Sequence, residues 1–147
     1  MIEYINYQDK LLSVIIRTRF EKDGIEFFTP GDFSQQLAYM KRPKNYAIPP
    51  HVHNPVPRKV EFTQEVLFIK CGKVRVDFYD DDNNYLESRI LYPGDVILLA
   101  HGGHGFVMLE ESEIIEAKQG PYAGDDDKTS FKEADIDKVI IKETTDD

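Results

Sequence analysis

The sequence contains no tryptophan and only one cysteine, Cys71, among its 147 residues. A single cysteine cannot form an intramolecular disulfide. Positive charge is also scarce, because 18 Lys and Arg residues stand against 27 Asp and Glu residues, for a net charge of −9. Proteins that bind nucleic-acid phosphates or an anionic membrane surface need the opposite balance. We therefore expect neither nucleic acid nor a membrane as a partner.

The chain also lacks any apolar run long enough to cross a bilayer. Its first twenty residues do not have the basic, apolar and small-residue regions of a secretory signal peptide. We therefore expect a cytoplasmic protein. A chain of this length with 41% hydrophobic residues suits one compact domain, residues 1–147.

No segment shows a convincing helical apolar stripe, and the patterns throughout are those of β-strands. In 74–79, for example, Val74, Val76 and Phe78 alternate with polar or amphipathic residues, as in a half-buried strand. Many short strands separated by Gly, Pro and Asp turns are typical of a sandwich or barrel. We expect an all-β fold with one helical turn near 132–137. The expected strands are 11–20, 33–40, 46–48, 65–70, 74–79, 85–92, 95–99, 113–118 and 139–141.

All four histidines fall in two short clusters, one at His51 and His53 and the other at His101 and His104. Residues i and i+2 of an extended strand point to the same side, so His51 and His53 can aim both imidazoles into one cavity. Glu65 opens the next apolar segment, where an inward-pointing charge needs a partner. Imidazole and carboxylate together suit a divalent metal ion.

The order and spacing of two motifs resemble the cupin superfamily over roughly residues 35–120. The first motif has the pattern His-x-His, spacer, Glu, six residues and Gly, which is matched by His51, His53, Glu65 and Gly72. The second has a Pro-Gly-Asp turn, an apolar strand, a glycine loop and a histidine, which are matched by residues 93–95, 96–99, 102–103 and His104.

This resemblance implies a double-stranded β-helix, that is, a cupin jelly-roll barrel, with N-terminal strands (1–34) and a C-terminal strand (121–147) packed on it. It also implies one divalent metal ion, such as Fe, Mn, Zn or Ni. The implied ligands are His51, His53, Glu65 and His104. Cupins of this kind act as isomerases, epimerases, lyases or dioxygenases on small polar metabolites, and we take a sugar or sugar derivative as the first expectation.

Two other kinds of function stay open at this point. One is a non-catalytic metabolite-binding or sensing cupin in which the metal only anchors the ligand. The other is a metal-free isomerase that uses histidine as acid or base. Fold alone does not choose among these functions.

The sequence departs from the family pattern at both motifs. The spacer between His53 and Glu65 is longer than usual, so Glu61 rivals Glu65 as the carboxylate ligand and is otherwise the candidate catalytic proton-transfer group. The second motif is one residue short before His104, which leaves His101 as a rival ligand.

The long spacer predicts a loop, 55–61, that covers the barrel mouth and contributes to specificity. Arg58 and Lys59 on this loop suit an anionic group of a substrate. Further polar groups of the cavity are expected from Gln36, Tyr39 and Tyr122. We also expect a homodimer, because the long apolar strand 11–20 would otherwise have an unpaired edge.

Overall fold

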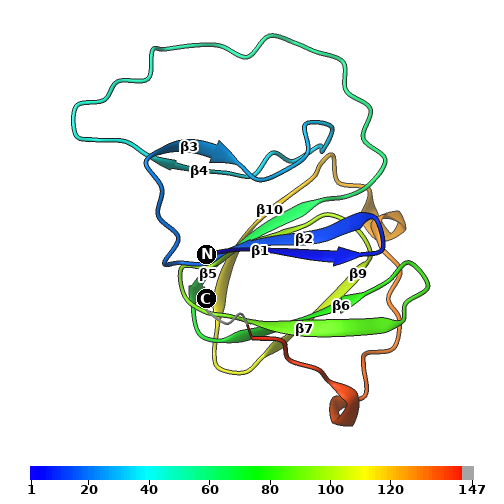
Figure 1. The fold of residues 1–147 in the computed structure, drawn as a ribbon. Helices are drawn as coiled ribbons and strands as arrows, with labels where there is room; N and C mark the ends of the chain where they lie inside the picture. Colours follow the sequence, from blue (N-terminus) through cyan, green and yellow to red (C-terminus); the bar gives the residue numbers. More distant parts are fainter. Residues whose placement is uncertain (144–147) are drawn as a thin grey trace.

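The computed structural model of the chain describes residues 1–143. Within this range the protein is all-β, with ten strands in three antiparallel sheets, two short 3₁₀ turns and no α-helix (Figure 1). The predicted all-β class is confirmed. The last four residues of the expected C-terminal strand segment, 144–147, lie outside the described range.

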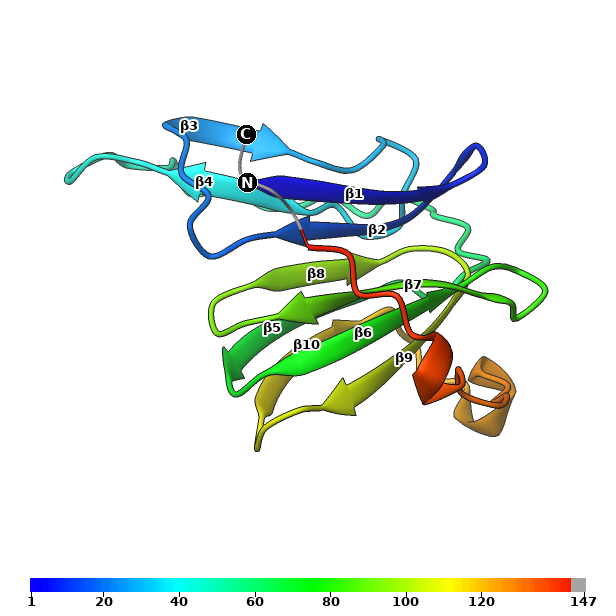
Figure 2. The ribbon, with the colours of Figure 1, turned by 60° about the horizontal axis from the view of Figure 1, so that its bottom comes forward.

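Two sheets form the body of the molecule, and a hairpin packs on the outside of the larger one (Figures 1 and 2). The larger sheet has the strand order β1 (Ile2–Tyr7), β2 (Lys10–Ile16), β8 (Val96–Leu99), β5 (Glu65–Cys71) and β10 (Glu113–Lys118). The smaller has the order β7 (Tyr85–Leu91), β6 (Val74–Tyr79) and β9 (Gly103–Met108). The hairpin consists of β3 (Gly24–Phe27) and β4 (Ala38–Lys41). The 3₁₀ turns are η1 (Gly124–Asp127) and η2 (Ile136–Lys138).

The main core fills the space between the two larger sheets. Leu67 and Ile69 of β5 are buried in it, whereas Phe68 between them is partly exposed on the outer face. This is the alternation expected of a strand with one buried face. β2 and β8 are different because the hairpin covers their outer face, where Val14 and Leu98 belong to a second cluster. Burial on both faces explains why these two segments are apolar without alternation.

The two sheets do not close into a continuous barrel within the described residues. β10 pairs only with β5, and β9 pairs only with β6, so each of these strands has one open edge. The space between these two edges is the place where the candidate site lies. A jelly-roll barrel is therefore a more specific fold than the pairing of these two sheets shows.

Several expected elements differ from those observed. The segment 46–48 is not a strand, and neither is the His51–His53 segment, which was expected to be extended in a sheet. Prolines at 43, 49, 50, 55 and 57 explain this, because proline lacks the N–H that a sheet ladder needs. The expected strand 139–141 makes one isolated bridge, Ser88 with Ile141. No bounds were predicted for β1 and β3, which fall among the expected N-terminal strands (1–34), or for β9, the strand that contains His104.

The long strand expected at 11–20 ends at Ile16 and lies inside the larger sheet, paired with β1 on one side and β8 on the other. The reason given for a homodimer, an unpaired edge on this strand, was therefore wrong. Dimerisation stays a prediction that needs another basis.

Candidate ligand-binding cavity

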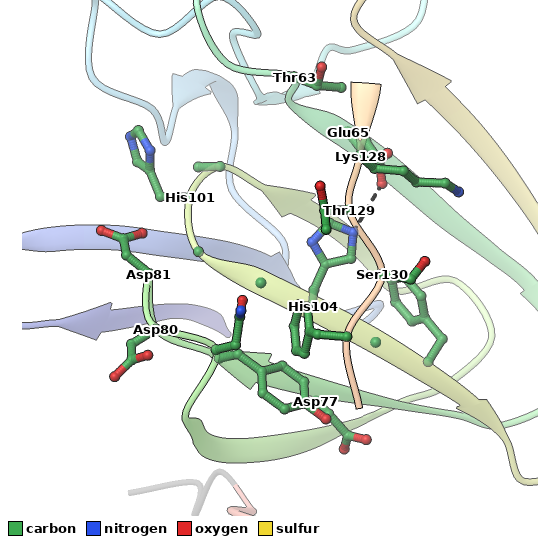
Figure 3. A pocket seen from close by; sticks show the side chains of 18 of the residues that line it. Thr63, Glu65, Asp77, Asp80, Asp81, His101, His104, Lys128, Thr129 and Ser130 are labelled. Carbon is green, nitrogen blue, oxygen red and sulfur yellow. Dashed lines mark ion pairs between the residues drawn. The ribbon is translucent and has the colours of Figure 1, made fainter. Parts of the chain in front are cut away.

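A cavity of about 980 Å³ lies between β9 of the smaller sheet and β5 and β10 of the larger one (Figure 3). Its wall combines aromatic side chains with carboxylates, lysines, imidazoles and hydroxyls. The aromatic members are Phe62, Tyr79, Phe106 and Phe131, and the ionisable members are Lys10, Glu65, Asp77, Asp80, Asp81, His101, His104, Glu116, Lys118, Asp127, Lys128 and Glu133. Cavities of this size with convergent polar groups are typical of small-molecule sites.

Glu65 and His104 face each other across this cavity. Glu65 is the first residue of β5 and His104 the second residue of β9, and His104 Nε2 lies 3.3 Å from Glu65 Oε2. This contact with His104 lowers the pKa of the Glu65 carboxyl, and burial opposes it. Glu65 is therefore held as a carboxylate, with its side chain only 16% exposed.

Lys118 connects this pair to the C-terminal part of the chain. It is the register partner of Glu65 on β10, and its Nζ lies 3.5 Å from Glu65 Oε1 and 2.7 Å from Asp127 Oδ2. Thr63 Oγ1 donates a hydrogen bond of 2.7 Å to the other oxygen of Asp127. The bonds from Lys118 and Thr63 lower the pKa of Asp127. The bond to Asp127 in turn raises the pKa of Lys118.

The cavity wall on the open side is a segment without strands, residues 124–142, which we call the strap. The hydroxyl of Tyr79 accepts a 2.9 Å hydrogen bond from the Ala134 amide, and the hydroxyl of Tyr85 accepts one of 2.8 Å from the Ile140 amide. The Phe131 ring meets the Tyr79 ring edge-on at 5.0 Å between centroids. Gly103 permits this approach, because a Cβ there would lie 2.7 Å from the Phe131 ring.

At the floor of the cavity a buried carboxylate is already neutralised. Arg75 makes two hydrogen bonds to Asp77, of 2.8 and 2.9 Å, and Ser88 donates another to the same carboxylate. Burial of an unpaired charge here would be costly, so this network is needed for the fold. Asp77 is thus already paired within the chain and is not free to act as a base.

His101, the rival to His104 in sequence, lies at the rim of the cavity. Its ring is between Phe33 and Phe62, at 5.8 and 5.4 Å between centroids. It also lines the cavity, so both members of the second histidine cluster are at the site.

His51 and His53 do not join them. Both lie on a long segment, residues 42–61, that we call the arm, and both are exposed. Their rings meet each other at 5.2 Å between centroids, and neither lines the cavity. Among residues 1–143 no three His, Cys, Asp or Glu side chains are grouped as a metal site. The described structure therefore brings together two of the four expected ligands, Glu65 and His104.

The other expected site residues lie outside the cavity. Glu61 is exposed on the arm and pairs with Lys59 at 2.5 Å, and Arg58 contacts the Val56 carbonyl. The amide of Gln36 donates to the carbonyls of Pro30 and Phe33 in the turn between β3 and β4. Tyr39 packs on Phe20 beneath the hairpin, and Tyr122 is 88% exposed. None of these lines the cavity.

Sequence reasoning missed Thr63, Lys118, Asp127 and Phe131. No motif marks them, and they meet only because β10 runs beside β5 and the strap crosses the open edge. A signal was present in one case: Lys118 ends an apolar β segment, as Glu65 begins one, and strand ends of this kind often face a cavity mouth.

No family model, curated protein or solved structure matches this chain. No helix among the described residues is long and apolar enough to span a membrane. The case for a function consequently rests on the cavity.

Proposed function

We propose that the cavity binds a small polar metabolite, a sugar or sugar derivative being the first expectation, and that Glu65 and His104 act on it as an acid–base pair. The observation that carries this proposal is the 3.3 Å contact between His104 Nε2 and Glu65 Oε2 in the wall of a 980 Å³ cavity. A perturbed carboxyl in a cleft is a typical feature of functional sites.

The pair has the properties that proton transfer needs. When the imidazole is neutral and carries its hydrogen on Nε2, that hydrogen is donated to Glu65 and the other nitrogen, Nδ1, is a free acceptor. His104 can then take a proton from a carbon next to a carbonyl and return it to the carbonyl carbon, while the proton of the neighbouring hydroxyl passes to the carbonyl oxygen, as in an aldose–ketose isomerisation. Glu65 stabilises the imidazolium that forms, and Lys118 lies 3.5 Å from the other oxygen of Glu65.

The same observations support the finer fold assignment. A five-stranded sheet facing a three-stranded antiparallel sheet across one core is consistent with a cupin-type jelly roll whose barrel is open between β9 and β10. The resemblance of the two sequence motifs is the other support for it.

The second candidate is the metal-dependent reaction that the resemblance implies. It is favoured by the attachment of the arm, because Thr63, just after the arm, lines the cavity and the arm carries His51 and His53. The described side chains offer Glu65 and His104 without a third ligand, so the present geometry does not fit a metal centre. No step of the proposed reaction uses one.

The test is a chemical-shift titration of the ¹⁵N-labelled protein with free hexoses, hexose phosphates and small carboxylic acids. We expect one class to shift the amides of β9 and the first residues of β5. His104→Gln and Glu65→Gln should each abolish or strongly weaken the shifts, whereas Tyr122→Phe, outside the cavity, should leave them unchanged. Shifts that persist in both cavity variants would overturn the proposal.

Elemental analysis of untagged protein separates the two candidates. The acid–base proposal expects far less than one metal ion per chain. A stoichiometric Fe, Mn, Zn or Ni that is lost in both His104→Gln and His51→Gln would favour the metal-dependent candidate instead. If the protein binds a ligand but converts none of the compounds that it binds, its function is that of a binding or sensing module.

A further inference from the structure

The arm is a long stretch of chain with almost nothing holding it to the rest of the molecule. Among the described residues, its hydrogen bonds, ion pairs and ring contacts are all made within the arm itself. They join Tyr46 to Arg42 and Pro43, His51 to His53 and Pro49, Arg58 to Val56, and Lys59 to Glu61. Figure 1 shows the arm as a wide arc above the β3–β4 hairpin, away from the smaller sheet.

The arm nevertheless exposes many apolar side chains. Its five large hydrophobic residues are between 41% and 83% exposed: Tyr46, Ile48, Val52, Val56 and Val60. Exposed apolar groups gathered on one segment mark an interaction surface, because water contact with them is unfavourable. Five prolines at and near these residues limit the freedom of the free arm, which lowers the entropy lost when it docks.

The charge of the arm is opposite to that of the remaining chain. Residues 42–61 contain four Lys or Arg and one acidic residue, so the other residues of the chain contain 14 basic and 26 acidic ones. The cavity wall has seven Asp or Glu residues and three lysines, and six acidic residues remain when Asp77, which is paired with Arg75, is left out. The arm and the cavity mouth are thus complementary in charge.

The cavity also borders two strand edges that have no ladder partner among the described residues. β9 and β10 each have one unpaired edge there. Residues 51–54 of the arm contain no proline, so two of their four amides can pair with one such edge, since successive amides of a strand point to opposite sides. Because both ends of the arm are fixed in its own chain, its twenty residues can reach out by about half of their extended length, roughly 33 Å, which is enough to touch a neighbouring molecule.

From these observations we propose that the arm docks on the cavity mouth of a second copy of this chain, and that two copies exchange arms. One chain carries both complementary parts, so a two-fold arrangement satisfies both arms and both cavities at once. The arm of one copy would then cover the mouth of the other copy's cavity. The inference rests on the proposed function only for the location of the cavity.

The first experiment measures association by sedimentation velocity. The wild type should be dimeric at tens of micromolar in low salt and should dissociate as salt screens the charge pairs. The triple variant Lys44→Glu, Arg58→Glu, Lys59→Glu should raise the dimer Kd by at least about 30-fold. The matched variant Arg19→Glu, Lys22→Glu, Lys70→Glu, at exposed positions outside the arm, the strap and the cavity, should not. A wild type that is monomeric at 100 µM would overturn the proposal.

The second experiment identifies the contact, in a Cys71→Ala background and with a short bismaleimide cross-linker. Val52→Cys on the arm and Glu133→Cys at the cavity mouth are placed on separate chains of different mass and mixed. We expect a cross-linked heterodimer, and none when Glu133→Cys is replaced by Glu110→Cys in the β9–β10 turn. A third sample is a chain that carries both Val52→Cys and Glu133→Cys. If cross-links form only within this chain, the arm closes on its own cavity, and exchange is refuted. These readouts do not depend on ligand binding, so they can fail while the proposed function holds.

Discussion

The arm and the strap are both irregular segments of about twenty residues, yet they differ in how they are held. The strap is fixed by two tyrosine hydroxyls, by the Asp127 carboxylate and by the Phe131 ring. The hydrogen bonds, ion pairs and ring contacts of the arm, in contrast, all stay within the arm in the part of the chain that the structure describes. A segment without strands can therefore be a permanent part of the cavity wall if a few polar groups and one aromatic ring anchor it. Without such anchors it is available for another partner.

The difference has a physical origin in the strands beneath each segment. Tyr79 and Tyr85 present their hydroxyl groups beside amides of the strap, which would otherwise have no backbone partner. The hairpin below the arm in Figure 1 instead exposes the apolar side chains Ile25, Phe27 and Met40. We therefore expect substitutions in the strap to change the free energy of unfolding, and substitutions in the arm to change the association of two chains.

The largest effect is expected where the strap meets the core. Phe131→Ala removes a ring that packs on Tyr79 and lies above Gly103, and it should lower the free energy of unfolding by about 2 kcal/mol. Val52→Ala on the arm, 83% exposed, should change it by less than about 0.5 kcal/mol. Urea denaturation of dilute protein in 0.5 M salt measures both without contribution from association. Equal effects would break the distinction between the two segments.

A smaller effect is expected from one hydroxyl. Tyr79→Phe keeps the ring but leaves the Ala134 amide without its acceptor, which should cost about 1 kcal/mol. Hydrogen exchange should speed up at Ala134, while the amides of β2 keep their protection. Tyr46→Phe on the arm is the matched control, and it should change neither quantity. Unchanged exchange at Ala134 would mean that the hydroxyl does not anchor the strap.

The smallest effect is electrostatic and appears in acid. Lys118 and Thr63 hold the pKa of Asp127 below its usual value of about 4, so the ionised form favours the folded state above that value. This contribution is lost as the pH falls through the lowered pKa. Lys118→Met should raise the pKa of Asp127, measured by NMR titration of its carboxyl carbon, whereas Lys138→Met should not. An Asp127 pKa that stays low in Lys118→Met would assign the effect to Thr63 alone.

The alternation and turn residues of the sequence predicted strands such as β5, which buries one face. They also predicted β6, but as a half-buried strand, whereas all six of its residues are buried. They failed at the segment 46–53, where apolar residues and a His-x-His pattern suggested strands but the prolines between them prevent a ladder. They gave no bounds for β9, because its glycines and its almost uniform, intermediate burial give no period. The local sequence pattern predicted a strand well where the strand packs against one neighbouring layer of the protein.

For the candidate site, the sequence by itself predicted that histidines and a carboxylate from the two motifs lie together. Glu65 and His104 are neighbours in the structure. Only the tertiary structure decided that His101, Lys118, Asp127 and the strap share their cavity while the two arm histidines lie apart. The reason is that contacts between β5, β9, β10 and the strap depend on strand pairing and register over long sequence separations. A local pattern does not specify which edges stay open or what crosses them.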